Sequence, residues 1–206
     1  MLGNNCSGKH TGMLLFARQL GADLDGYLEP DHPVQVANRR VMERFFGLEL
    51  PTSRRAVDGC GVPTYHVPIE SVATGFAALG ADRAPAVERL HRALDAFPRA
   101  TSGEGRLPWR FHPFLAPAFR SKEGAEGAIA VWGERGALVV KSQDGDLRGY
   151  RWALPELLAA LGWLDADTVA RWRDEDPPRV KNVAGRVVGR VEIVGCDLPD
   201  ASANAR

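Results

Sequence analysis

Hydrophobic positions recur at helical spacing in several separate stretches of the chain. Residues 8–19 carry a broad apolar face that stops before Gly21, which predicts a helix ended by glycine. Asp31-His32-Pro33 opens a second apolar periodic stretch, and that stretch ends at Gly47. Further helices are predicted at about 69–79, 84–96, 153–162 and 166–173.

Shorter apolar runs predict strands, most of them in the second half of the chain. Residues 128–132 and 137–141 flank Gly133-Glu134-Arg135-Gly136, and this pattern predicts a tight hairpin. A short strand is also predicted at 54–57. The segment 180–194 predicts one or two final strands, with bends at its glycines.

One long stretch lacks a clear period. Residues 100–125 are rich in glycine, proline and aromatic side chains, so we predict a loop that crosses the domain there. The pattern as a whole predicts an α+β domain with an antiparallel sheet late in the sequence.

Length, composition and charge favour a single soluble domain over residues 1–206. The chain is 45% hydrophobic and 25% charged, which are ordinary values for a globular protein. Acidic and basic residues balance at 26 each, so no net field attracts nucleic acid or an anionic membrane. No apolar run approaches the ~18–20 residues of a membrane span, and the amino end lacks a signal-peptide pattern. We therefore expect a cytoplasmic protein.

The three cysteines are too few, and odd in number, for a disulfide scaffold. In a reducing compartment, Cys6 and Cys60 are interpreted as thiols or as metal ligands. Cys196 follows an apolar run and is interpreted as a passive residue.

A glycine-rich stretch at the amino end nearly matches the phosphate-binding loop G-x-x-x-x-G-K-[ST]. Gly3, Gly8 and Lys9 fit its spacing, but His10 occupies the position of the hydroxyl residue. Thr11 comes one position late, which on a helix turns its side chain about 100° away. The sequence therefore argues against a nucleotide site.

Two glycine-flanked cysteines indicate one polar pocket that is built from two distant loops. Cys6 and Lys9 are three residues apart, so at the start of a helix they face the same way. Cys60 would join them from the second loop. A metal site is one interpretation, although a lysine must lose its proton to bind zinc. The alternative is two small buried thiols beside a surface lysine, with Asp58 forming an Asx-turn.

Four segments of the chain resemble the bacterial asparaginase II family, the Rhizobium-type asparaginases. They are N-N-C-S-G-K-H-x-G-M-L at 4–14, D-G-C-G-V-P-T at 58–64, V-V-K-S-Q-D-G-D at 139–146 and N-V-A-G-R-V-V-G at 182–189. They span nearly the whole chain in the expected order, and the first two are quite specific. The resemblance implies an α+β fold like that of serine β-lactamases and penicillin-binding proteins, with helices flanking an antiparallel sheet.

The resemblance also implies roles for the matching residues. Cys6, Lys9 and Cys60 are expected to bind one zinc ion per chain, with water as the fourth ligand, and the zinc is expected to shape the substrate site. His10 and Asp58 are expected to hold the substrate. Lys141 is expected to be the lysine of a second Ser/Lys pair, whereas a lysine after an apolar strand is otherwise typical of a solvated strand end.

The implied activity is hydrolysis of L-asparagine to L-aspartate and ammonia by a homodimer. The family's nucleophilic serine and its base form an S-x-x-K pair before the Asn-Asn-Cys motif, and no S-x-x-K occurs in these 206 residues. We therefore expect that the amino-terminal part of the fold is missing and that the chain alone has little activity. Two alternatives are a non-catalytic zinc- or ligand-binding remnant of the family, and a Cys6 thiolate nucleophile that uses His10 as its base.

Overall fold

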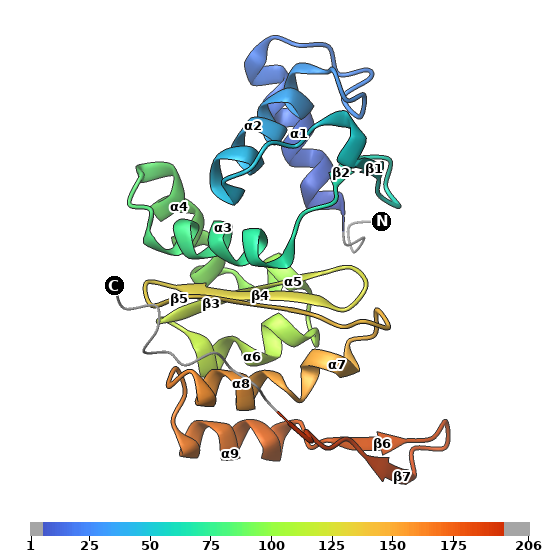
Figure 1. Ribbon diagram of the computed structural model, residues 1–206, viewed down its shortest axis with the longest axis vertical. Helices are drawn as coiled ribbons and strands as arrows, with labels where there is room; N and C mark the ends of the chain where they lie inside the picture. The colour runs from blue at the N-terminus through green and yellow to red at the C-terminus, as the bar shows by residue number, and fades with distance from the viewer. Residues whose placement is uncertain (1–5, 196–206) are drawn as a thin grey trace.

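The computed structural model describes residues 6–195, which form layers around a small antiparallel sheet (Figure 1). The amino-terminal layer contains α1 (Ser7–Leu20), α2 (Pro33–Phe46), a 3-10 turn (Thr52–Arg54) and the hairpin of β1 (Arg55–Val57) and β2 (Pro63–Tyr65). The next layer contains α3 (Ile69–Ala81) and α4 (Pro85–Ala96), which lie above the sheet. The combination of helices and antiparallel strands confirms the predicted α+β class.

Both predicted amino-terminal helices are present and end where the sequence indicates. Gly21 and Gly47 follow α1 and α2 in left-handed conformations, with φ of 67° and 66°. At the start of α2, the Val34 backbone N–H donates a hydrogen bond to the His32 ring. The two helices share a small core of buried side chains: Met13, Ala17, Val34 and Val62.

The central sheet has the order β3 (Phe119–Gly124), β4 (Ala128–Gly133), β5 (Gly136–Lys141), and its β4–β5 hairpin was predicted. Its lower face carries Phe119, Ile129 and Val131, which are buried in the main core. This core is completed by α6 (Leu107–Leu115), α7 (Arg148–Arg151), α8 (Leu154–Ala160) and α9 (Ala166–Glu175). Figure 1 shows these helices below the sheet and α3 above it.

The predicted loop over residues 100–125 is wrong. The segment completes α5 (Pro98–Ser102) and then forms α6 and β3. The prolines Pro98 and Pro108 occupy the first turns of α5 and α6, where proline starts a helix instead of breaking it. The strand β3 escapes prediction because it is largely polar, and its pairing with β4 supplies the order that its own sequence does not indicate.

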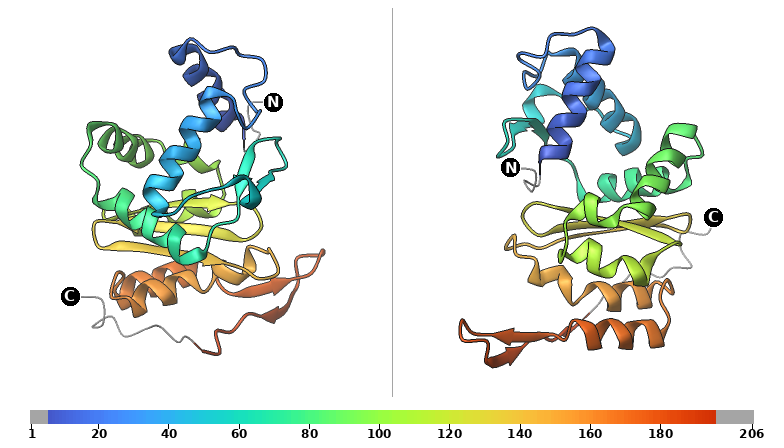
Figure 2. Two further views of the ribbon diagram at one scale, coloured as in Figure 1. Left: turned by 45° about the horizontal axis from the view of Figure 1, so that its top comes forward. Right: turned by 180° about the vertical axis from the view of Figure 1, so that it is seen from behind.

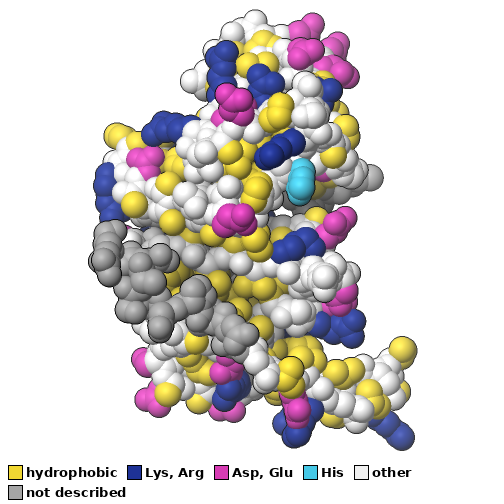
Figure 3. Space-filling view, in the orientation of Figure 1, with side chains coloured by type: hydrophobic (Ala, Val, Ile, Leu, Met, Phe, Trp, Pro, Cys, Tyr) yellow, Lys and Arg dark blue, Asp and Glu magenta, His cyan; other side chains and the backbone are white. Residues whose placement is uncertain are grey.

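The carboxy-terminal hairpin projects from the rest of the molecule. It pairs β6 (Arg179–Lys181) with β7 (Val187–Arg190), and the pairing is irregular at Val180 and Lys181. In both views of Figure 2, the hairpin extends away from α8 and α9. Figure 3 shows basic and acidic side chains interspersed over the visible face of the molecule. Among the described residues, no helix is long and apolar enough to cross a membrane.

Two glycines let α3 approach its neighbours closely. A Cβ atom added at Gly80 would lie 2.3 Å from the carbonyl oxygen of Gly133 in β4. A Cβ atom added at Gly75 would lie 2.6 Å from the Phe46 ring in α2. Because real Cβ atoms do not approach so closely, α3 holds both the sheet and the amino-terminal layer through positions where a side chain is excluded.

We expect Gly80→Ala to lower the free energy of unfolding by about 1–3 kcal/mol, because the new methyl group must displace backbone atoms of β4. Gly12→Ala in α1 is the matched control, since its added Cβ meets nothing within 4 Å. Alanine should there be neutral or stabilise the helix by up to about 1 kcal/mol. Urea unfolding of the two variants checks this, and equal stabilities would show that the α3–β4 contact imposes no constraint.

Candidate functional site

The start of α1 meets the turn between β1 and β2. Lys9 Nζ donates a hydrogen bond to Asp58 Oδ2 at 2.5 Å, although the two residues are 49 positions apart. The other oxygen, Asp58 Oδ1, accepts hydrogen bonds from the backbone N–H of Cys60 at 2.8 Å and of Val62 at 2.9 Å. The predicted Asx-turn is thus present, and the same carboxylate also binds the lysine of the first motif.

Asp58 supplies the negative charge that the first turn of α1 lacks. That turn has no acidic residue, and a lysine there is unfavourable because a helix amino terminus is partially positive. Burial acts to raise the pKa of Asp58, but the hydrogen bonds from Lys9, Val62 and Cys60 lower it overall. Burial acts to lower the pKa of Lys9, but the hydrogen bond and charge of Asp58, with the charges of Cys6 and Cys60, raise it overall. The pair is therefore ionised at neutral pH.

The two cysteines belong to the two segments that this ion pair joins, the start of α1 and the β1–β2 turn. Cys6 immediately precedes α1, and its carbonyl oxygen accepts the backbone hydrogen bond of His10 at 3.0 Å. A hydrogen bond with Cys6, together with burial, raises the pKa of the Cys60 thiol, whereas Lys9 acts to lower it. The structure thus brings Cys6, Lys9, Asp58 and Cys60 into one cluster from two loops.

The cluster is open to solvent. Both cysteines are half-buried, and the Lys9 and Asp58 side chains are 39% and 30% exposed. A Cβ atom added at Gly8 or at Gly59 would meet no atom within 4 Å. The cluster is therefore partly exposed to solvent and has open space beside both glycines.

The donor atoms of the cluster fit zinc in type. Two adjacent thiols and an amine are nitrogen and sulfur ligands of the kind that zinc accepts. Residues 6–195 hold no group of three or more His, Cys, Asp and Glu side chains suited to a metal, so this set depends on its lysine. Since Lys9 is protonated and bound to Asp58, metal binding requires that the amine release both its proton and this partner.

His10 follows Lys9 in the sequence, but its side chain contacts Tyr27 and not the cluster. It follows Lys9 by one helical position, which rotates its side chain by about 100°. Its Nδ1 is 2.7 Å from the Tyr27 hydroxyl, and the two rings meet edge to face with their centroids 5.8 Å apart. This contact joins α1 to the loop before α2. A substrate-binding role for His10 stays a prediction.

Lys141 occupies the exposed end of β5. Its Nζ donates a hydrogen bond to the Ser142 carbonyl oxygen at 2.6 Å. Strand pairing places Lys141 on the sheet face that carries Ala130 and Val139, opposite the face that packs on the main core. This position is compatible with a solvated strand end, and the catalytic role implied by the resemblance stays a prediction.

Sequence reasoning missed a second lysine on this face of the sheet. Lys122 of β3 pairs with Ala130, so its side chain projects on the same side as Lys141. Burial lowers the pKa of Lys122, and Arg106 adds to this effect, whereas Glu123 and Cys6 oppose it. Its Nζ donates a hydrogen bond to the Glu123 carbonyl oxygen at 2.7 Å. Because the side chain is also exposed, water screens these charges and limits the shift.

The signal that could have identified Lys122 is the alternation of polar and buried positions in β3. Phe119 and Glu123 are buried on the core face, whereas Lys122 projects from the other. Because this segment was predicted to be a loop, the alternation of a strand was not considered there. On the core face, Glu123 accepts hydrogen bonds from the Tyr150 hydroxyl at 2.6 Å and from Arg106 at 3.2 Å.

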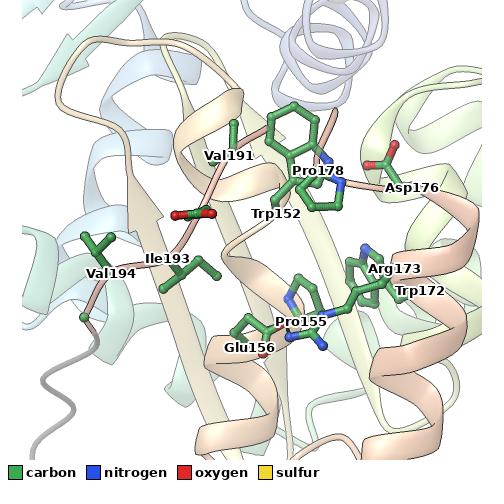
Figure 4. A pocket seen from close by; sticks show the side chains of 12 residues that line it. Trp152, Pro155, Glu156, Trp172, Arg173, Asp176, Pro178, Val191, Ile193 and Val194 are labelled. Carbon is green, nitrogen blue, oxygen red and sulfur yellow. Dashed lines mark hydrogen bonds and ion pairs between the residues drawn. The ribbon is translucent and has the colours of Figure 1, made fainter. Parts of the chain in front are cut away.

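A cavity of about 800 Å³ lies elsewhere, between α8, α9 and the segment 191–195 (Figure 4). Its walls include the side chains of Trp152 and Trp172 and none of the predicted site residues. Its charged lining residues are paired, Asp176 with Arg110 and Arg151, and Glu156 with Arg173. The cluster around Lys9 is the better candidate for chemistry, because it combines ionised groups with thiols that solvent can reach.

Comparison with known proteins gives this cluster a context. No curated protein matches the chain. A family model described as L-asparaginase II matches residues 1–193 and so covers both loops of the cluster and the whole central sheet. The chain therefore belongs to the L-asparaginase II family.

Proposed function

We propose that the protein is an amidohydrolase that acts on L-asparagine and releases L-aspartate and ammonia. Membership of the L-asparaginase II family supports an amidohydrolase activity. The observation that carries the proposal in this chain is the Lys9–Asp58 pair, held at 2.5 Å beside two cysteines in an open part of the surface. The cluster offers fixed charges of both signs, as a zwitterionic amino acid requires.

Asparagine carries an ammonium group, a carboxylate and a side-chain amide. In the proposal, the Asp58 carboxylate attracts the ammonium group, while His10 takes part in holding the rest of the molecule. The Cys60 and Val62 backbone N–H groups fix the position of the Asp58 carboxylate. Because these two donors belong to the turn itself, the carboxylate is held in place before substrate arrives.

Cys6, Lys9 and Cys60 are the proposed holders of one zinc ion. When bound, zinc would supply a fixed positive charge that shapes the substrate site. Lys9 would exchange its hydrogen bond to Asp58 for the metal, which frees Asp58 Oδ2 to receive the substrate. The Lys9–Asp58 ion pair joins the two loops that carry these residues.

We propose Lys122 as a further basic group of the site, together with Lys141. A lysine takes a proton from a hydroxyl nucleophile only after its own amine has lost one, and a lowered pKa favours that state. The pKa of Lys122 is lowered by burial, and its Nζ donates a hydrogen bond to the Glu123 carbonyl oxygen at 2.7 Å. Lys122 and Lys141 lie on one sheet face, separated by β4, so the two strand spacings place them about 10 Å apart across the sheet.

Substrate binding tests the proposed function directly. Titration calorimetry with L-asparagine should show that Asp58→Asn weakens binding by about 10–100-fold, as expected for the loss of a hydrogen bond to a charged group. Asp174→Asn in α9 is the matched control, since that residue lies in the layer on the other side of the sheet, and it should bind as the parent does. Equal affinity in all three proteins, or no binding by the parent, would contradict the proposal.

Metal content tests the zinc site. Protein purified with zinc should hold about one ion per chain, and Cys60→Ala should lose it, because three protein ligands would become two. Cys196→Ala is the control and should retain the ion. Zinc affinity should fall as the pH falls, since the thiols and Lys9 then keep their protons. Equal zinc in both variants would place the metal elsewhere.

The lysine pKa values can be measured one by one, because the sequence has only Lys9, Lys122, Lys141 and Lys181. In an NMR titration of protein labelled at the lysine Cε, one signal should titrate below the ordinary lysine value of about 10.4. That signal should vanish in Lys122→Met. A signal that titrates above the ordinary value should vanish in Lys9→Met. If Lys122→Met removes no low-titrating signal, its amine is not set up to act as a base.

A further inference from the structure

A buried histidine joins α4 to the central sheet. His91 of α4 and Trp132 of β4 are only 6% and 2% exposed. The indole Nε1–H of Trp132 donates a hydrogen bond to His91 Nε2 at 3.3 Å. We propose that this hydrogen bond is an acid-sensitive contact, which breaks when His91 takes up a proton and then releases α4 from the sheet. The contact uses none of the candidate site residues, so the proposal does not depend on the proposed function.

The chemistry of the two rings fixes the direction of this hydrogen bond. An indole N–H donates and cannot accept, so His91 Nε2 must carry no proton while the bond exists. A protonated imidazole carries an N–H on both ring nitrogens. The N–H groups of Trp132 and His91 would then face each other, and no hydrogen bond could form between them. The new positive charge would also be buried, which disfavours the contact further.

Two neighbouring contacts hold the same part of α4 and of the sheet. The Trp132 ring packs against Phe76 of α3, with ring centroids 5.0 Å apart. Asp95 lies one turn after His91 on α4, and it forms an ion pair at 2.5 Å with Arg120 of β3. Strand pairing places Arg120 directly opposite Trp132. Protonation of His91 therefore leaves α4 attached beside a half-exposed ion pair, which water screens.

The surroundings of His91 favour its neutral form. Burial lowers the pKa of His91, and the nearby charged groups act in both directions: Arg120 and Arg83 lower the pKa, whereas Asp95 and Asp82 raise it. In the unfolded chain the histidine takes up a proton near its ordinary pKa of about 6.5. The contact therefore stabilises the fold fully above that pH, and its contribution is lost as the pH falls through the lower pKa of the folded state.

Release of α4 would change the sheet face that carries Lys122. Arg120 and Lys122 are two positions apart in β3, so their side chains project on the same face of the sheet. Trp132 shares this face, because it pairs with Arg120. Since α4 covers the face through His91 and Asp95, its departure at acidic pH would expose the sheet beside Lys122.

NMR of the tryptophan indole N–H groups tests the contact. The Trp132 signal, assigned by its loss in Trp132→Phe, should shift in one transition with a midpoint below about 6.5 as the pH is lowered from about 7.5 to about 5. In His91→Gln, the amide oxygen can accept the indole hydrogen bond but does not titrate, so the transition should be absent. His66→Gln, at an exposed histidine, is the matched control and should keep it. A Trp132 signal that does not respond to pH, or that responds equally in His91→Gln, overturns the proposal.

Hydrogen exchange tests the release of α4. After correction for the intrinsic effect of pH on exchange, protection of the α4 amides should fall by about tenfold or more across the same transition. Protection of α9, on the other side of the sheet, is the internal reference and should change less. In His91→Gln, protection of α4 should not depend on pH in this way. A Trp132 transition without loss of protection in α4 overturns the release of the helix.

Discussion

The close packing of α3 is the constraint on which the arrangement of the layers depends. At Gly80 the helix touches the backbone of β4, and at Gly75 it touches the end of α2, in each case without space for a Cβ atom. Because protein interiors are close-packed, a helix and a sheet in such close contact cannot shift relative to each other without steric overlap. The position of the amino-terminal layer relative to the sheet is therefore fixed through α3.

Within that frame, one ion pair organises the site. Asp58 makes three stabilising interactions. Its carboxylate accepts hydrogen bonds from two backbone N–H groups of its own turn, and it forms an ion pair with Lys9. It also places a negative charge near the start of α1, where the helix dipole favours one. The same ion pair joins the two loops that carry Cys6 and Cys60. Two thiols and an amine are ligands of the kind that zinc accepts.

Much of the fold was predictable where local signals agree. The helices that end at Gly21 and Gly47 combine apolar periodicity with a glycine stop, and both lie where predicted. The β4–β5 hairpin combines two apolar strands with a glycine turn. The segment 100–125 misled because its prolines start helices and because β3 owes its order to pairing with β4. Hydrophobic periodicity indicates that one face of an element is buried. It does not identify a polar strand such as β3, whose conformation depends on pairing with a neighbouring strand.

The sequence by itself determined which residues carry chemistry. Cys6 and Lys9 stand out by their spacing and Asp58 and Cys60 by their glycine-flanked turn, and the family match over residues 1–193 agrees with those motifs. Only the tertiary structure decided that Asp58 binds Lys9, that His10 contacts Tyr27, and that Lys122 shares a sheet face with Lys141. Spacing along a helix fixes direction within that helix, but a contact between residues 49 positions apart depends on how whole layers pack. That packing depends on α3. The sequence shows its glycines at positions 75 and 80, but it does not show that they contact α2 and β4.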